Sequence, residues 1–176
     1  MKPPQKPLTL LFFVLSFLTK SSALNEASEA LFKWKESLED SHSLDSWSIK
    51  SHDETNPCKW VGITCDSSHS VVEINLPHFN LSGTLDDLDF TSLLNLTALN
   101  LNGNFLHGPI PSNISALSKL TLLDLGNNGF IGAIPPEIGR LSELIDLRLY
   151  SNFLNHTIPY QLGNLKKVQS QMQLVF

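Results

Sequence analysis

The stretch LTLLDLGNNGFIGAIPPEIGRLSE (residues 120–143) carries the pattern on which the fold depends. Its leucines and isoleucines fit neither the period of a helix nor that of a strand over the whole length. The stretch before it is LTALNLNGNFLHGPIPSNISALSK (96–119), and the one after it is LIDLRLYSNFLNHTIPYQLGNLKK (144–167). The three stretches are equal in length and follow one another directly. A fixed period of this length indicates a solenoid built from repeated units.

The three copies agree in six columns of leucine, isoleucine or proline. The shared columns are Leu96/Leu120/Leu144, Leu99/Leu123/Leu147, Leu101/Leu125/Leu149, Ile110/Ile134/Ile158, Pro111/Pro135/Pro159 and Leu117/Leu141/Leu165. In L-x-x-L-x-L the last two leucines alternate as in a short strand and point to one face. One unit cannot bury that face alone, so neighbouring units must stack around a continuous core.

A looser copy precedes these three. It fits when the spacing to the next copy is lengthened by a single position, which places Ile74 in the column of Leu99. We therefore predict four repeats, over residues 72–95, 96–119, 120–143 and 144–167, within a repeat region that spans 71–167.

One asparagine column runs through the last three repeats, at Asn104, Asn128 and Asn152. Each follows the last strand leucine, where its amide can bond backbone groups left unpaired at the turn. Three copies in register predict an internal hydrogen-bonded ladder. Phe79 occupies this column in the first repeat, so the ladder should begin one repeat later.

The repeat pattern L-x-x-L-x-L-x-x-N-x-L-x-G-x-I-P resembles the plant-type leucine-rich repeat. GPIP (108–111) and GAIP (132–135) carry the most specific part, whereas the last repeat has His156 in place of the glycine. The resemblance implies an α/β solenoid, a right-handed horseshoe arc with a parallel β-sheet on its concave face. His156 makes only the local turn uncertain.

The segment before the repeats, residues 24–70, has the features of a cap. Ala27, Leu31, Trp34 and Leu38 form one helical stripe. The ordered series EALFKWKESL (29–38), SW (46–47), PCKWVGITC (57–65) and VVEINL (71–76) resembles the N-terminal capping domain of plant leucine-rich-repeat receptors. This resemblance covers residues 24–167 and is closest to the beginning of receptor-like kinase ectodomains.

The chain has two cysteines, Cys58 and Cys65. Two nearby cysteines in a secreted protein most simply form a disulfide. Metal binding is less favoured, because the spacing is not C-x-x-C and no set of histidines and cysteines accompanies them. A reactive thiol would need a paired histidine that the sequence context lacks.

Residues 1–23 have the composition of a secretory signal peptide: two lysines before the apolar run LTLLFFVLSFL (8–18) and small residues at 21–23. A retained membrane anchor is the alternative, but the run is short for a span. We expect a secreted or extracellular protein, at the cell surface if part of a longer receptor, with no membrane span in this chain. A net charge of −5 and the lack of a basic cluster argue against nucleic acid as a partner.

Side chains between the strand leucines should form columns on the concave face, where they are free for recognition. The predicted binding residues are Glu73, Asn75, Asn100, Asn102, Asp124, Asp146, Arg148 and Tyr150. Arg148 can fork onto a carboxylate and Tyr150 supplies a flat amphipathic contact. Alternatively, Asp124 lies diagonally beside Arg148 and simply forms a cross-strand ion pair with it.

Four N-x-[S/T] sequons, at Asn80, Asn95, Asn113 and Asn155, fall in variable columns. We expect at least two of them to carry glycans if the chain passes through the secretory pathway. No catalytic signature, metal-ligand spacing or cofactor motif is found, so we predict no enzyme activity, no metal and no cofactor.

The end of the chain, residues 168–176, departs from the pattern. Leucines are expected at 171 and 173, but both positions are glutamine. We interpret 168–176 as an irregular tail. In one interpretation Met172, Leu174 and Phe176 lie back over the last repeat as a makeshift lid. We favour the other, in which the chain is a truncated receptor product that lacks later repeats, a membrane helix and a kinase domain.

Two functions follow from the resemblance. The first is a receptor or co-receptor ectodomain that binds a peptide or another leucine-rich-repeat ectodomain. The second is a secreted inhibitor of a cell-wall-degrading enzyme, similar to polygalacturonase inhibitors. We favour the first, because an inhibitor should have both ends capped.

Overall fold

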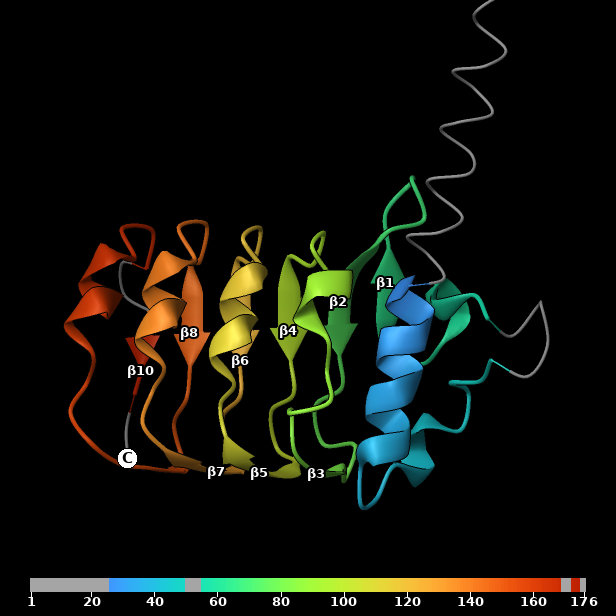
Figure 1. The fold of residues 1–176 in the computed structure, drawn as a ribbon, viewed down its shortest axis with the longest axis horizontal. Helices are drawn as coiled ribbons and strands as arrows, with labels where there is room; N and C mark the ends of the chain where they lie inside the picture. Colours follow the sequence, from blue (N-terminus) through green and yellow to red (C-terminus); the bar gives the residue numbers. More distant parts are fainter. Residues whose placement is uncertain (1–25, 50–54, 169–171, 175–176) are drawn as a thin grey trace, which may run out of the picture.

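The structure is a computed structural model that describes residues 26–49, 55–168 and 172–174. The predicted signal peptide (1–23) lies outside the described residues. Figure 1 shows the repeats as a row of similar units, with a helical cap covering one end. Each unit contributes a strand to one long sheet, a short strand to a second sheet and a helical turn on the opposite side.

The long sheet has the strand order β1-β2-β4-β6-β8-β10. Its strands are β1 (Ile63–Cys65), β2 (Val71–Asn75), β4 (Ala98–Asn100), β6 (Leu122–Asp124), β8 (Asp146–Arg148) and β10 (Met172–Gln173). β1 pairs antiparallel with β2, and every other pair is parallel. A leucine-rich-repeat solenoid with a parallel sheet is therefore confirmed.

The register of this sheet places the repeated leucines next to one another. Ile74 pairs with Leu99, Leu99 with Leu123, and Leu123 with Leu147. All four side chains are fully buried and belong to one continuous hydrophobic core. Each repeat thus completes the core of its neighbour, which is the reason that no unit could fold alone.

A second sheet was not expected from the sequence. It consists of the parallel strands β3 (Ser82–Gly83), β5 (Phe105–Pro109), β7 (Gly129–Gly132) and β9 (Phe153–Leu154). The glycine of the G-x-I-P motif lies in this segment with a positive φ, 77° at Gly108 and 80° at Gly132. His156 has a φ of 72° at the same position. The shape of the turn is therefore kept, although its residue is one that rarely adopts this conformation.

The side opposite the long sheet carries 3-10 helices. They are η3 (Phe90–Ser92), η4 (Ser112–Ala116), η5 (Pro136–Arg140) and η6 (Tyr160–Asn164), and they stand in a row in front of the strands in Figure 1. Proline begins η5 and immediately precedes η4 and η6. Its fixed φ suits the start of a helical turn. Ile114, Ile138 and Leu162 point inward from these turns and join the core.

The cap combines a helix over residues 26–37 with η1 (His42–Leu44), η2 (Pro57–Lys59) and β1. The predicted helical stripe is buried: Ala27, Leu31, Trp34 and Leu38. Trp47 packs between Trp34 and Trp60, with ring centroids 6.2 Å and 5.4 Å away. The Cys58–Cys65 disulfide is formed, with 5.5 Å between the Cα atoms.

The end of the sheet corrects one expectation. Met172 pairs with Leu147 and Gln173 with Arg148, so a strand stands where we predicted an irregular tail. The spacing from Leu147 to Met172 exceeds the regular period by a single position, as does the spacing between the first two repeats. Leu174 therefore occupies the column of Leu149 and packs against the core. Because of this shift, the strand begins one position later than a strict period predicts, which explains why positions 171 and 173 are not leucine.

The asparagine column bonds backbone groups of two adjacent repeats. Asn128 accepts from Leu106 N at 3.1 Å and donates to Leu101 O at 2.9 Å, both in the preceding repeat. Asn152 accepts in the same way from Phe130 N at 3.0 Å. In the first turn the Oδ1 atom of Asn104 accepts from Phe79 N and Leu81 N, at 3.0 and 3.1 Å. These buried bonds hold successive turns in register.

We expect Asn128→Ala to lower the free energy of unfolding by about 2–3 kcal/mol, since it leaves buried N–H and C=O groups without partners. Chemical denaturation of the purified protein measures this change. Asn164→Ala on η6, where the side chain is exposed, is the matched control and should have little effect. Equal losses in the two variants would contradict a structural role for the ladder.

Side chains of the cap and of the second sheet are also in contact. Glu39 accepts from Ser82 Oγ at 2.9 Å and lies 3.3 Å from His107 Nε2. The hydrogen bond from Ser82, followed by that from His107, lowers the pKa of Glu39 below its ordinary value of 4.5. A carboxyl group with a lowered pKa stabilises the fold above that ordinary value, and the contribution is lost as the pH falls through the lower, folded-state value.

Glu39→Gln should therefore reduce the dependence of the melting temperature on pH below 4.5, relative to the unchanged protein. Thermal melts at a series of acidic pH values test this. Glu36→Gln, at an exposed position of the cap helix that ends just before Glu39, is the control. If the Glu39 variant followed the same pH profile as the unchanged protein, the contact would not contribute to stability.

Candidate functional site

The concave sheet arranges the predicted binding residues in register columns. The first column contains Glu73, Ala98, Leu122 and Asp146, and the second contains Asn75, Asn100, Asp124, Arg148 and Gln173. Because side chains alternate along a strand, these positions point away from the leucine core. The residues that follow the strands, Asn102, Gly126 and Tyr150, extend the same surface by a third column.

Arg148 is held by two carboxylates. It donates from Nε and Nη2 to the two oxygens of Asp146, at 3.1 and 2.5 Å, and from Nη1 to Asp124 Oδ2 at 3.3 Å. Asp124 is its direct partner in the sheet and not a diagonal neighbour. Asp146, which contributes most, and Asp124 both raise the pKa of the guanidinium. The cross-strand ion pair that we considered is present, and it restrains Arg148.

The two carboxylates are much less exposed than the arginine. The Asp124 side chain is 4% exposed and that of Asp146 is 10% exposed, whereas Arg148 is 34% exposed. The outer edge of the guanidinium is therefore the part of this cluster that a partner could touch.

Asn102 links three repeats. Its Nδ2 donates to Asp124 Oδ1 at 2.9 Å and to the Tyr150 hydroxyl at 3.0 Å, and its Oδ1 accepts from Asn127 Nδ2 at 3.2 Å. Asn102 is buried. Tyr150 therefore extends over the neighbouring repeat and contacts a residue two repeats earlier in the chain.

Gly126 makes this reach possible. A Cβ atom at this position would lie 2.9 Å from two ring atoms of Tyr150 and 2.9 Å from Asn102 Nδ2. The phenol therefore lies over the glycine backbone, in space that any side chain would fill. Nothing in the sequence signalled this role, because a glycine has no side chain from which it could be inferred.

Two further predicted residues, Asn75 and Asn100, connect to Asn102 on the side nearer the cap. Asn100 Nδ2 donates to Asn75 Oδ1 at 3.0 Å, and Asn100 Oδ1 accepts from Asn102 N at 3.1 Å. Seven of the eight predicted residues therefore form one connected network. Glu73 is half-buried on the same face, and its side-chain carboxylate has no hydrogen bond within the described part of the chain.

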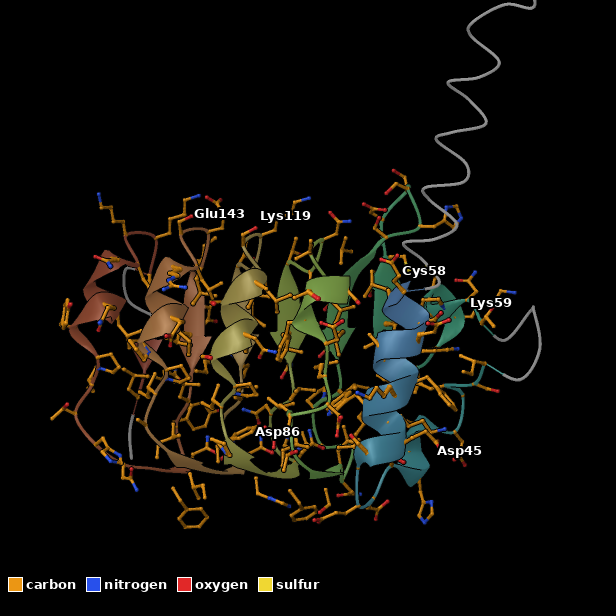
Figure 2. All side chains as sticks on the ribbon, viewed as in Figure 1. Asp45, Cys58, Lys59, Asp86, Lys119 and Glu143 are labelled. Carbon is orange, nitrogen blue, oxygen red and sulfur yellow. A yellow bond between two sulfur atoms is a disulfide. The ribbon has the colours of Figure 1, made fainter. Side chains whose placement is uncertain are left out.

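The four sequons lie outside the concave strands. Asn80, Asn113 and Asn155 are exposed, and Asn95 is half-buried. Asn95 Oδ1 accepts from Lys119 Nζ at 2.6 Å, at the edge from which Lys119 and Glu143 project in Figure 2. Glycosylation at these positions stays a prediction, and it would leave the concave columns uncovered.

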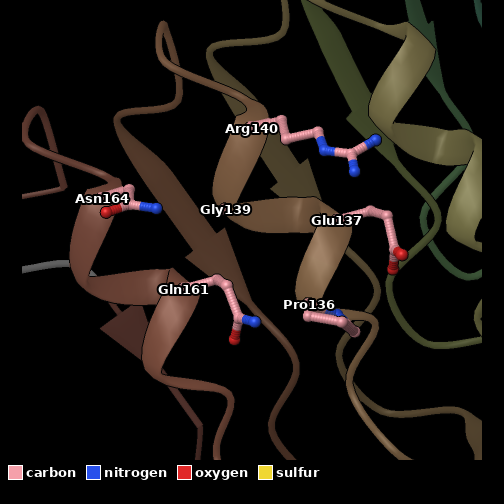
Figure 3. A pocket seen from close by; sticks show the side chains of 6 residues that line it. All are labelled: Pro136, Glu137, Gly139, Arg140, Gln161 and Asn164. Carbon is pink, nitrogen blue, oxygen red and sulfur yellow. The ribbon is translucent and has the colours of Figure 1, made fainter.

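A hollow of about 210 Å³ on the opposite side is a weaker candidate. It lies between η5 and η6, and Figure 3 shows Gln161 and Asn164 facing η5 while Glu137 and Arg140 extend to the far side. Its volume is below that of ordinary small-molecule sites, which are roughly 300–1,000 Å³. Within the described ranges there is no cluster of three or more potential metal ligands and no helix able to cross a membrane.

Comparisons with known proteins agree with this architecture. The family model of the leucine rich repeat N-terminal domain matches residues 24–66, and that of the leucine rich repeat matches 95–117 and 119–141. A probable leucine-rich repeat receptor-like protein kinase of Arabidopsis thaliana is 37% identical over 106 residues, which is 59% of this chain and 10% of that protein. Curated relatives are matched over only 8–16% of their length.

Solved structures give the same picture. The BIR2 ectodomain from Arabidopsis thaliana is 31% identical with a TM-score of 0.73, and the match covers 80% of this chain and 75% of that one. The plant peptide hormone receptor RGFR1 in complex with RGF2 is 39% identical with a TM-score of 0.59, over 65% of this chain and 17% of that one.

We expect Gly126→Ala to destabilise the protein by about 1–3 kcal/mol, because the added methyl group displaces Tyr150 or Asn102. Gly163→Ala is the control, since a Cβ there meets nothing within 4 Å. Denaturation curves measure both. In a Tyr150→Ala background the cost of Gly126→Ala should shrink, and an unchanged cost would show that the tyrosine does not occupy this space.

Proposed function

Since the chain belongs to the family of plant leucine-rich-repeat receptor ectodomains, we propose that it is an extracellular recognition module that binds a peptide or another ectodomain through its concave face. The fold and the repeats point to a non-catalytic module. The kinase activity of the curated relatives is a property of proteins of which this chain spans a small part.

The observation that carries the proposal is the connected polar network on the concave sheet. Its side chains come from four repeats, yet the leucine core does not need them. The network restrains Arg148 and Tyr150 before any partner arrives, which lowers the entropy cost of binding. The RGFR1 structure, a peptide hormone receptor with the same fold, supports a peptide as one class of partner.

The alternative, an inhibitor of a cell-wall-degrading enzyme, is not favoured by the comparisons, since the proteins matched above are a receptor-like protein kinase, a peptide hormone receptor and an ectodomain. It remains a distinct outcome of the binding test. A polygalacturonase is the appropriate enzyme for that comparison.

The structure decides which substitutions are suitable for the test. Arg148→Ala would leave Asp124 and Asp146 without their counter-ion, and an uncompensated buried carboxylate is strongly destabilising. Asn75 is exposed and Tyr150 is half-buried, so these two positions are better choices.

The double change Asn75→Ala/Tyr150→Ala should weaken partner binding at least about tenfold, if two interface contacts are each worth about 1 kcal/mol or more. The probes are a panel of synthetic plant secreted peptides, purified receptor ectodomains and a polygalacturonase, measured by biolayer interferometry. Glu137→Ala/Arg140→Ala on η5 is the control pair. Unchanged binding in the concave variant, or capture of the polygalacturonase alone, would contradict the proposal.

A further inference from the structure

Within the described part of the concave face, donor hydrogen atoms without a partner gather in the second column. A guanidinium has five N–H groups, and three of those of Arg148 are used by Asp146 and Asp124. Two N–H groups remain, one on each Nη atom, at the exposed end of the side chain. Asn100 Nδ2 makes one bond, and Asn75 Nδ2 makes none within the described part of the chain.

The side-chain oxygens of Asn75, Asn100 and Asp124 in the same column already accept hydrogen bonds. Asn75 Oδ1 and Asn100 Oδ1 accept from Asn100 Nδ2 and Asn102 N. Asp124 Oδ1 accepts twice, from Gly126 N at 3.0 Å and from Asn102 Nδ2. The Tyr150 hydroxyl accepts from Asn102 and keeps its own hydrogen for donation. A partner that lies along the second column from Asn75 to Arg148 meets mainly donors.

A column of donors could suit either an anion or a neutral acceptor, and the local charge decides between them. Arg148 carries one positive charge, and Asp124 and Asp146 carry two negative charges. Coulomb energy varies as the reciprocal of distance, so for an anion on the free edge one attraction at about 4 Å is cancelled by two repulsions at about 7 Å. The cluster therefore offers hydrogen bonds without net attraction for a negative charge.

The free carboxylate on this face acts in the same direction. Glu73 is half-buried in the first column, so it adds negative charge near Asn75. A peptide carbonyl oxygen is a strong acceptor with no net charge. It can use the donors without meeting the repulsion that a carboxylate meets.

The length of the column fits an extended chain. Asn75 and Arg148 lie three strand spacings apart, which is about 14 Å at about 4.8 Å per strand. Four or five residues of extended peptide cover that distance at about 3.3 Å per residue.

From these observations we propose that the column Asn75–Asn100–Arg148, together with the Tyr150 hydroxyl, binds the main-chain carbonyl groups of an uncharged, extended peptide segment of four or five residues. This inference rests on the proposed function of the concave face and names the chemistry of its partner. It differs from the sequence-based expectation that Arg148 pairs with a carboxylate of the ligand.

The charge argument is tested without any ligand, because the chain contains only two arginines, Arg140 and Arg148. Their Nε–H signals in a nitrogen-15 spectrum of the secreted protein report on each separately. Sodium acetate is added stepwise, and sodium chloride at the same ionic strength is the control. In the unchanged protein we expect the Arg148 signal to respond to acetate no more than that of Arg140, which lies exposed on η5.

Asp146→Asn should change this outcome by removing one negative charge and freeing the Nε edge. The Arg148 signal should then follow a saturable acetate curve, at least about tenfold tighter than that of Arg140. Asp124→Asn serves in its place if a thermal melt shows Asp146→Asn to be unfolded. Saturable acetate binding by the unchanged protein, or no gain in a folded variant, would overturn the charge argument.

The partner chemistry is tested with a displayed library of random dodecapeptides. Peptides enriched on the unchanged protein over the Asn100→Ala variant should share a segment of four or five residues without Asp, Glu, Lys or Arg. Their affinity should change less than about threefold between about 50 and 500 mM salt.

The outcomes separate the two proposals. Enriched peptides that depend on Asn100 but carry an acidic residue or need a free C-terminal carboxylate would leave the concave binding function standing and overturn the neutral-segment inference. Enrichment that is equal on the unchanged protein and on the Asn100→Ala and Asn75→Ala/Tyr150→Ala variants would contradict concave binding itself, and the inference with it.

Discussion

The structure depends on one constraint: a single repeat exposes an apolar strand face that it cannot cover by itself. The core is therefore a column of leucines shared by successive repeats, with Leu99, Leu123 and Leu147 in contact through the register of the parallel sheet. The asparagine ladder satisfies the backbone groups that each turn leaves unpaired. The tryptophan-rich cap covers the first repeat, where no preceding repeat exists.

Once stacking is fixed in this way, the concave side chains are held in columns whose spacing the sheet sets. This places side chains distant in sequence within hydrogen-bonding distance, such as Asn102 and Tyr150, which belong to repeats that are not adjacent. The resulting network is rigid because almost every polar group has a partner inside it. A surface of this kind recognises a partner by the few groups that remain, which here are the donors of the second column and the carboxylate of Glu73.

The chain also tolerates departures from the repeat pattern. His156 takes the positive φ of the motif glycine, and Phe79 replaces the ladder asparagine in the first repeat while its backbone N–H bonds Asn104 of the next. Two of the repeat boundaries exceed the regular period by a single position. In each case the hydrogen bonds and buried leucines of neighbouring repeats preserve the geometry that the local sequence does not specify.

The sequence by itself determined the repeat unit, the buried leucine columns, the ladder asparagines, the cap helix and the membership of the concave columns, because all of these follow from periodic spacing that the chain displays directly. Only the tertiary structure decided the rest. The second sheet depends on backbone pairing between turns, and the last strand, at Met172–Gln173, depends on a register that tolerates an inserted position. The clamp on Arg148 and the place of Tyr150 over Gly126 depend on distances between repeats, which no single stretch of sequence contains.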